Sequence, residues 1–270
     1  MLAKISEAVE FIKSKYATRP IVGIVLGSGL GSFISEIDIE CKIDYADIPN
    51  FPLSTVEGHS GQLIFGEISG KKVVAMAGRF HYYEGYSTGE VVFPIRVLKF
   101  LGIETLLISN AAGGTNKTFS VGDLMIIRDH ISMLTLNPLL GKNEDQFGQR
   151  FPDMSEPYKK HLIALAKNIA GENGIEIKEG VYVGVTGPTF ETRAEYKMLN
   201  ILGGDAVGMS TVQEVIAAVH MGLPVFAMSV ITDIGIREEE NRITHEEVLL
   251  AASEAEPKLT LIFKNMIAAI

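Results

Sequence analysis

The segment AGRFHYYEGY, residues 77–86, holds the side chains best suited to binding an anion. Arg79 presents a planar fork of N–H donors that fits phosphate oxygens, and His81, two residues further on, can add another donor. Tyr83 offers an aromatic face that carries a hydroxyl. Because a solvated loop is rarely this aromatic, the segment favours a binding function over simple packing of its tyrosines.

Small-residue segments mark further places where a ligand could approach the backbone. LGSGLG (26–31) can turn backbone amides toward an anion, and Ser28 adds a hydroxyl. Its spacing is neither the dinucleotide fingerprint nor a P-loop, so taken alone it predicts only a tight turn. SNAAGG (109–114) and VGMS (207–210) permit close approach of a ligand, but they equally permit tight packing of a helix on a sheet. His59 lies in the glycine-flanked turn EGHSG, where a lone histidine is more often structural.

Two carboxylates accompany apolar or aromatic residues. GPTFET (187–192) sets Phe190 beside Glu191, and an aromatic face next to an acceptor suits a flat heterocycle with an N–H on one edge. The same sequence would also fit a phenylalanine packed in the core beside an exposed glutamate. PVFAMSVITDIG (224–235) is an almost unbroken apolar run that delivers Asp233 near its end. The run is typical of a buried strand, so the acid at its tip requires an explanation.

Elements that could position these residues recur along the chain. Apolar or β-branched runs that end in small, polar or glycine residues predict strands at 21–29, 72–79, 104–114, 123–129, 181–191, 205–210 and 224–233. Helical segments lie between several of them, at 88–101, 157–173 and 211–221. This alternation indicates an α/β fold with a mostly parallel, twisted central sheet and helices on both faces. No linker or repeat divides the chain, so residues 1–270 are expected to form a single domain.

The ends of the predicted elements carry the most informative polar residues. Ligands of open α/β sheets bind beyond the carboxyl ends of the strands. One crevice is therefore expected to collect the polar residues at those ends, which are Ser28, Arg79, Asn110, Glu191, Ser210 and Asp233. For the last helix, Thr244 with Glu247 three residues later predicts a capping box, and Pro257 is expected to kink or interrupt that helix.

Composition limits the class of protein and its partners. The chain has 270 residues, is 47% hydrophobic and carries a net charge of −9, which argues against a nucleic acid or an anionic membrane as a partner. Cys41 is the one cysteine, so no intramolecular disulfide is possible and a cytoplasmic location is expected. Residues 1–16 suit an amphipathic surface helix better than a signal peptide, and the apolar region 215–231 is too interrupted to be a membrane span.

Five of these motifs together are distinctive. From about residue 20 to about residue 250 the chain resembles the trimeric purine nucleoside phosphorylase family, whose hallmarks stand here in order as GSGLG, GRFH, NAAGG, GPTFET and GMST. The resemblance implies an enzyme that splits the N-glycosidic bond of a purine nucleoside with inorganic phosphate, giving free base and ribose 1-phosphate. It implies no cofactor or metal, because phosphate is a co-substrate, and it implies a homotrimer.

The resemblance also assigns roles by motif position. The phosphate ligands would be Ser28, His59, Arg79, His81, Ser210 and the backbone of Asn110 and Ala111. The nucleoside would be held by Tyr83, Phe190, Glu191, Met209, Asp233 and His245, with Phe151 supplied by a neighbouring subunit. The residues expected to take part in catalysis are His81, Glu191 and Asp233.

One position departs from the family pattern. Where members that act on 6-oxopurines usually have asparagine, this chain has Asp233. An ionised carboxylate only accepts hydrogen bonds, which favours a 6-amino group, whereas Glu191 matches the N1–H of hypoxanthine or guanine. Protonation of Asp233 would restore a donor, at about 1.4 kcal/mol per unit of pKa shift. Inosine and guanosine are the expected substrates, with more tolerance for adenosine than the asparagine enzymes show.

The sequence leaves alternative functions open. An adenosine or methylthioadenosine phosphorylase is the nearest, although His245 counts against an apolar 5′-methylthio group. A hydrolase conflicts with the density of phosphate donors, and a non-catalytic nucleoside-binding protein conflicts with the presence of both the anion-binding and the base-binding residues.

Overall fold

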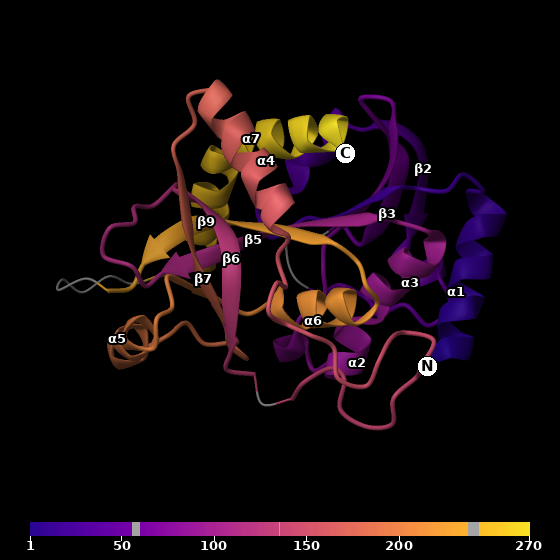
Figure 1. Ribbon diagram of the computed structural model, residues 1–270, viewed down its shortest axis with the longest axis horizontal. Helices are drawn as coiled ribbons and strands as arrows, with labels where there is room; N and C mark the ends of the chain where they lie inside the picture. The colour runs from indigo at the N-terminus through magenta and orange to yellow at the C-terminus, as the bar shows by residue number, and fades with distance from the viewer. Residues whose placement is uncertain (56–59, 135, 237–242) are drawn as a thin grey trace.

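A single sheet organises the computed structural model, which describes residues 1–55, 60–134, 136–236 and 243–270 (Figure 1). Within these residues nine strands pair in the order β2-β3-β4-β1-β5-β8-β7-β6-β9. The strands are β1 Val22–Val25, β2 Asp38–Asp44, β3 Gln62–Ile68, β4 Lys71–Ala77, β5 Thr105–Gly114, β6 Leu124–Ser132, β7 Ile177–Gly184, β8 Ala206–Gly208 and β9 Val225–Ile234. Because β9 also pairs with β5, the five strands β5, β8, β7, β6 and β9 close into a ring, and β4, β3 and β2 extend from it through β1.

The predicted α/β class is confirmed, and the sheet is mixed in detail. Among the described strands five pairings are parallel, namely β1–β4, β1–β5, β5–β9, β6–β7 and β7–β8. The antiparallel pairings join β2 to β3, β3 to β4, β5 to β8 and β6 to β9. The continuous apolar runs became strands that are buried along their length, as in β1 and β9.

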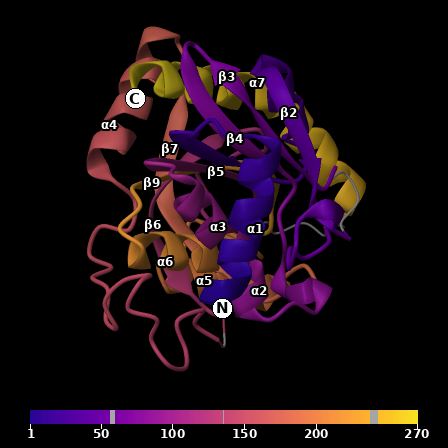
Figure 2. The ribbon, with the colours of Figure 1, turned by 90° about the vertical axis from the view of Figure 1, so that its right-hand side faces the viewer.

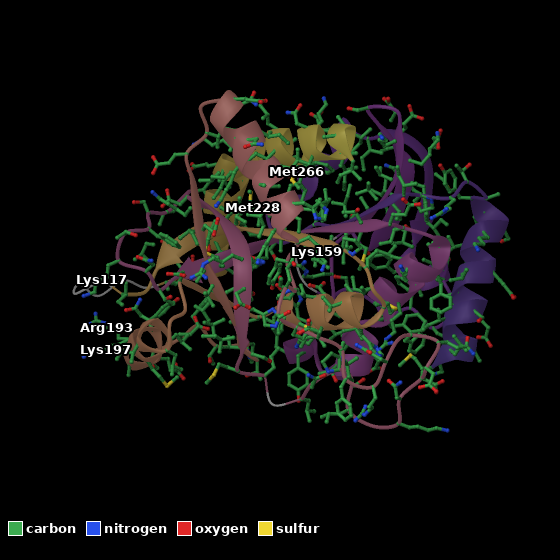
Figure 3. The ribbon with its side chains drawn as sticks, viewed as in Figure 1. Lys117, Lys159, Arg193, Lys197, Met228 and Met266 are labelled. Atoms are coloured by element: carbon green, nitrogen blue, oxygen red, sulfur yellow. The ribbon has the colours of Figure 1, made fainter. Side chains whose placement is uncertain are left out.

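Helices cover both faces of the sheet (Figure 1, Figure 2). They are α1 Leu2–Lys15, α2 Thr88–Val91, α3 Phe93–Leu101, α4 Lys160–Glu172, α5 Arg193–Ile201, α6 Val212–His220 and α7 His245–Ala269, with short 3₁₀ turns at Gly31–Glu36, Tyr45–Asp47 and Tyr82–Glu84. In both views α4 and α7 lie on one side of β5 and β9, and α2 and α6 lie on the other. The buried Met228 of β9 and Met266 of α7 mark the core between that strand and that helix (Figure 3).

The ends of the helices follow from local sequence. Thr244 accepts a hydrogen bond from the backbone N–H of Glu247, so the predicted capping box at the start of α7 is confirmed. Of the two effects expected of Pro257, a kink or an interruption, the interruption does not occur, because α7 continues through that residue to Ala269. The predicted helix at 88–101 is two helices, since Val92 separates α2 from α3 and Pro94 lies in the first turn of α3. In the described parts of the chain no helix has the length and apolar character needed to cross a membrane.

Candidate active site

One pocket gathers most of the residues that the sequence singled out. Its lining includes Ser28, Arg79, His81, Tyr83, Asn110, Ala111, Phe190, Glu191, Met209, Ser210, Asp233 and His245. Ser28, Arg79 and Ser210 follow the ends of β1, β4 and β8, as the crevice rule predicts. Asn110 and Asp233 instead lie inside β5 and β9, because these two strands run past the pocket and form its wall.

Arg79 forms the centre of the pocket's cationic end. Its side chain is 1% exposed, and its Nε donates to Oε1 of Glu214 at 3.2 Å. Its Nη1 donates to the backbone oxygen of Ser109 at 2.8 Å and to Oγ of Ser210 at 3.2 Å. Glu214 neutralises a charge that would otherwise be buried alone, and the three hydrogen bonds fix the plane of the guanidinium. The guanidinium of Arg79 is therefore held rigidly where it lines the pocket.

The turn after β8 adds further polar groups to the same end of the pocket. Asn110 Nδ2 donates to Oγ1 of Thr211 at 2.9 Å, while Asn110 Oδ1 accepts no hydrogen bond within the described residues. Thr211 has a φ of 69°, a left-handed backbone that is uncommon for a β-branched residue. The strain is held by Glu214, whose Oε2 accepts from the backbone N–H of Thr211 at 2.9 Å. Glu214 therefore orients both Arg79 and the turn that presents Ser210.

His81 is oriented by a neighbouring carboxylate. Its Nδ1 donates to Oε1 of Glu84 at 2.9 Å, and its backbone N–H donates to the same oxygen at 2.8 Å. Because Nδ1 carries the proton of the neutral ring, Nε2 becomes a donor only when His81 is cationic. The ring stacks on Tyr83 with centroids 4.7 Å apart. Glu84 and Tyr83 thus fix the orientation of the His81 ring where it lines the pocket.

Glu84 should stabilise the fold in a pH-dependent way. Burial alone would raise its pKa, but hydrogen bonds from His81 and Thr55 lower the pKa from 4.5 to about 2. A depressed carboxyl pKa stabilises the folded state above the ordinary pKa, and that stabilisation disappears as pH falls from about 4.5 toward 2. We expect Glu84→Gln to lower the free energy of unfolding by about 2 kcal/mol at neutral pH and by much less near pH 3. Urea unfolding at the two pH values measures this difference, and a constant difference would contradict it.

The opposite end of the pocket carries two carboxylates and aromatic side chains. Asp233 is 7% exposed, and its Oδ2 accepts a hydrogen bond from the hydroxyl of Tyr196 at 2.9 Å. Phe190 is 40% exposed and lies beside Glu191 in the connection between β7 and α5. Burial raises the pKa of Glu191, hydrogen bonds from its own backbone and from Tyr196 oppose that shift, and the negative charge of Asp233 adds to it. The two carboxylates can accept hydrogen bonds from N–H groups on the edge of a flat aromatic ligand.

Three further residues of the site were not identified from the sequence. Glu214, Glu84 and Tyr196 act through the predicted residues, and Glu214 lies 135 positions from Arg79 along the chain. Glu84 could have been found, because it follows His81 by three residues, the spacing of a helical turn. Tyr196 lies in the first turns of the helix that GPTFET opens, but nothing in that motif indicates that its side chain reaches Asp233.

One predicted residue lies away from the pocket, and another, His59, lies outside the described residues. Phe151 is 84% exposed and lines a separate hollow together with Leu139, Leu140 and Met154. Within the described ranges no group of three or more histidine, cysteine, aspartate or glutamate side chains could hold a metal ion.

Comparison with known proteins places this geometry in a family. Residues 21–268 match the family model described as the phosphorylase superfamily. The chain is 54% identical over 245 residues to "Purine nucleoside phosphorylase 1" of Geobacillus stearothermophilus, covering 91% of this chain and 89% of the relative. Two solved structures of Schistosoma mansoni purine nucleoside phosphorylase, one with adenosine and one with inosine, each superpose with a TM-score of 0.95 at 42% identity. The alignment covers 99% of this chain in both cases, and 97% and 96% of the respective solved chains.

Proposed function

The chain belongs to the purine nucleoside phosphorylases of the phosphorylase superfamily, and on that basis we propose that it acts on purine ribonucleosides and 2′-deoxyribonucleosides, preferring inosine and guanosine, in purine salvage. Such an enzyme is a pentosyltransferase that yields the free base and a pentose 1-phosphate. The observation that carries the proposal is one pocket with a buried arginine end and a two-carboxylate end.

The cationic end is proposed to bind phosphate. Arg79 and Ser210 supply side-chain donors, and the backbone of Asn110 and Ala111 lies beside them. Ser28 and His81 line the same pocket, and His59 is proposed to complete the set. Positioning phosphate against the nucleoside can lower a barrier by about 7–11 kcal/mol, because a bimolecular encounter becomes a step within one complex.

The rest of the pocket is proposed to bind the nucleoside. Tyr83, Met209 and His245 would surround the pentose, with His245 toward the 5′-hydroxyl, and Phe190 would pack on the purine. When the bond from C1′ to N9 breaks, positive charge develops on the sugar and negative charge on the base. Bound phosphate stabilises the cation and then forms the new bond at C1′, while N7 takes a proton from solvent and Asp233 accepts a hydrogen bond from the resulting N7–H. Glu191 accepts from the N1–H of a 6-oxopurine.

Asp233 favours a second candidate substrate, adenosine. Its Oδ2 already accepts from Tyr196, so the side chain is held as an acceptor, which suits a 6-amino group. The Schistosoma mansoni relative has been solved with adenosine as well as with inosine. We propose that adenosine is a slower substrate of this chain.

Phe151 is proposed to belong to a shared site in a homotrimer. The side chain is 84% exposed, which is unusual for a phenylalanine that has no function at an interface. Leu139, Leu140 and Met154 lie along the same hollow and would extend the buried area. Burial of this region against a second copy would bring Phe151 toward a neighbour's pentose.

The proposed reaction makes a direct prediction about phosphate. Incubation with inosine should release hypoxanthine and ribose 1-phosphate only when inorganic phosphate is present. Chromatography of the base, with guanosine and adenosine in parallel, measures both the requirement and the preference. Base release without phosphate would indicate a hydrolase, and no release from any nucleoside would refute the proposal.

A further inference from the structure

Thr211 is a buried residue next to the cationic end of the pocket. Its side chain is 0% exposed and does not line the pocket, whereas Ser210, the residue before it, is 8% exposed and does. Thr211 is the N-cap of α6, where its φ of 69° is an unfavourable left-handed backbone for a β-branched residue. Glycine would adopt that backbone at lower cost. The threonine side chain therefore requires an explanation other than backbone conformation.

The hydroxyl of Thr211 contacts two residues of the proposed phosphate site. Its Oγ1 accepts a hydrogen bond from Nδ2 of Asn110 at 2.9 Å, and it lies 3.1 Å from Oγ of Ser210. Turning the Asn110 amide over would place a buried NH₂ group where the described residues offer no partner, whereas the present orientation places only a carbonyl oxygen there. Asn110 is therefore the donor to Thr211, and Thr211 directs its own proton elsewhere.

The direction of the Thr211 proton determines the role of Ser210. Either hydroxyl can donate across the 3.1 Å contact between them. If Ser210 donated, the proton of Thr211 would be fully buried with no acceptor among the described residues, which is costly. If Thr211 donates, its proton is satisfied within the protein. Oγ of Ser210 then accepts from Thr211 and from Nη1 of Arg79 at 3.2 Å, and the Ser210 proton is directed to the pocket.

The two hydrogen bonds that Ser210 accepts limit what its hydroxyl can offer a ligand. A hydroxyl oxygen has two lone pairs, and here Thr211 and Arg79 occupy both, so Ser210 can only donate to a ligand. Phosphate oxygens accept hydrogen bonds, and a donor that is already oriented loses less conformational entropy when the anion binds. A freely rotating serine would present its lone pairs to the anion as readily as its proton.

Resting on the proposed function, we propose that Thr211 is a positioning residue that makes Ser210 an obligate hydrogen-bond donor to phosphate. The order of donation runs from Asn110 to Thr211, from Thr211 to Ser210, and from Ser210 to a phosphate oxygen. Thr211 acts through Ser210 and does not itself touch the substrate.

Thr211→Val tests this role, because valine keeps the shape of threonine and removes the hydroxyl. We expect the KM for phosphate to rise about tenfold, while kcat and the KM for inosine change by less than about twofold. Thr211→Ser keeps the hydroxyl and should hold the KM for phosphate within about twofold of the parent's. The matched control is Thr115→Val, since Thr115 is also 0% exposed and its hydroxyl donates to the backbone oxygen of Gly204 at 2.6 Å. This control should leave the KM for phosphate unchanged.

A double-mutant cycle shows whether Thr211 acts through Ser210. Ser210→Ala alone should raise the KM for phosphate. Adding Thr211→Val to it should raise that KM by less than about twofold further, because the hydroxyl that Thr211 orients is already absent. If the two effects multiply instead, Thr211 acts independently of Ser210 and the inference is overturned.

Thr211→Gly keeps the test decisive if the valine variant folds poorly. Glycine adopts the left-handed backbone without strain but has no hydroxyl. A purely structural role of Thr211 predicts a parental KM for phosphate in this variant, whereas the proposed role predicts a rise of about tenfold, as with valine. An unchanged KM in the glycine variant, or a raised KM in Thr211→Ser, overturns the inference while phosphorolysis itself remains. Absence of phosphate-dependent base release by the parent enzyme would instead refute the proposed function.

Discussion

Exchange of Arg79 for methionine is expected to lower kcat/KM for phosphate by about 10³-fold, since the pocket loses its rigid, buried donor. The same change leaves Glu214 buried without its cation, which should lower the free energy of unfolding by about 3–5 kcal/mol. Loss of activity alone would therefore not separate binding from folding. Steady-state kinetics with phosphate varied, together with urea unfolding, measures the two effects.

A double variant separates them. In Arg79→Met combined with Glu214→Gln no buried charge is left alone, and the glutamine oxygen can still accept from Thr211. Most of the lost stability should return, while phosphate use should not. Arg96→Met is the matched control, because Arg96 is also a buried arginine but stacks on Phe147. Its stability should fall without a change in kcat/KM for phosphate. A double variant that uses phosphate as the parent does would remove Arg79 from the phosphate site.

Asp233→Asn is expected to lower the adenosine-to-inosine ratio of kcat/KM by about 30–100-fold. The asparagine amide presents an N–H toward the 6-amino group of adenine, where the carboxylate accepted, and it offers O6 of hypoxanthine a donor. Removing the charge should also lower the pKa of Glu191, because Asp233 is one of the groups that raise it. Kinetics with both nucleosides across pH tests both effects. An unchanged preference would show that Asp233 does not distinguish the 6-amino group of adenine from O6 of hypoxanthine.

The sequence predicted the residues that the pocket presents better than the residues that hold them. Arg79 and His81 stand in a segment whose residue types indicate anion binding, whereas Glu214 meets Arg79 only because the fold brings α6 to the segment that follows β4. Tyr196 could not be assigned from local pattern, since its hydroxyl meets Asp233 through tertiary packing in the space beside Gly113 and Gly235. The side chains that line the pocket can be predicted from local motifs, whereas Glu214 and Tyr196, which hold them, come from distant parts of the chain.

The sequence did not predict β2, β3 or α5, and each omission has a physical reason. β2 reads DIECKID, and its side chains are mostly exposed, so it lacks the apolar run that marked the other strands. In β3, Gly66 breaks the apolar run of the sequence although the strand continues from Gln62 to Ile68, and a Cβ there would lie 2.3 Å from the backbone oxygen of Asp38. α5 has few buried residues and therefore a weak apolar stripe.

The closure of β9 onto β5 has a consequence for how the protein avoids self-association. A strand that ends a sheet displays unpaired N–H and C=O groups, which are a template for aggregation. Among the described strands, β2 is the one that terminates the sheet without a second neighbour. It carries Asp38, Glu40, Lys42 and Asp44 on alternate positions, and its pairing with β3 is irregular between Ile39 and Cys41. Charge and irregularity thus protect the edge that ring closure does not remove, and they oppose strand-to-strand polymerisation there.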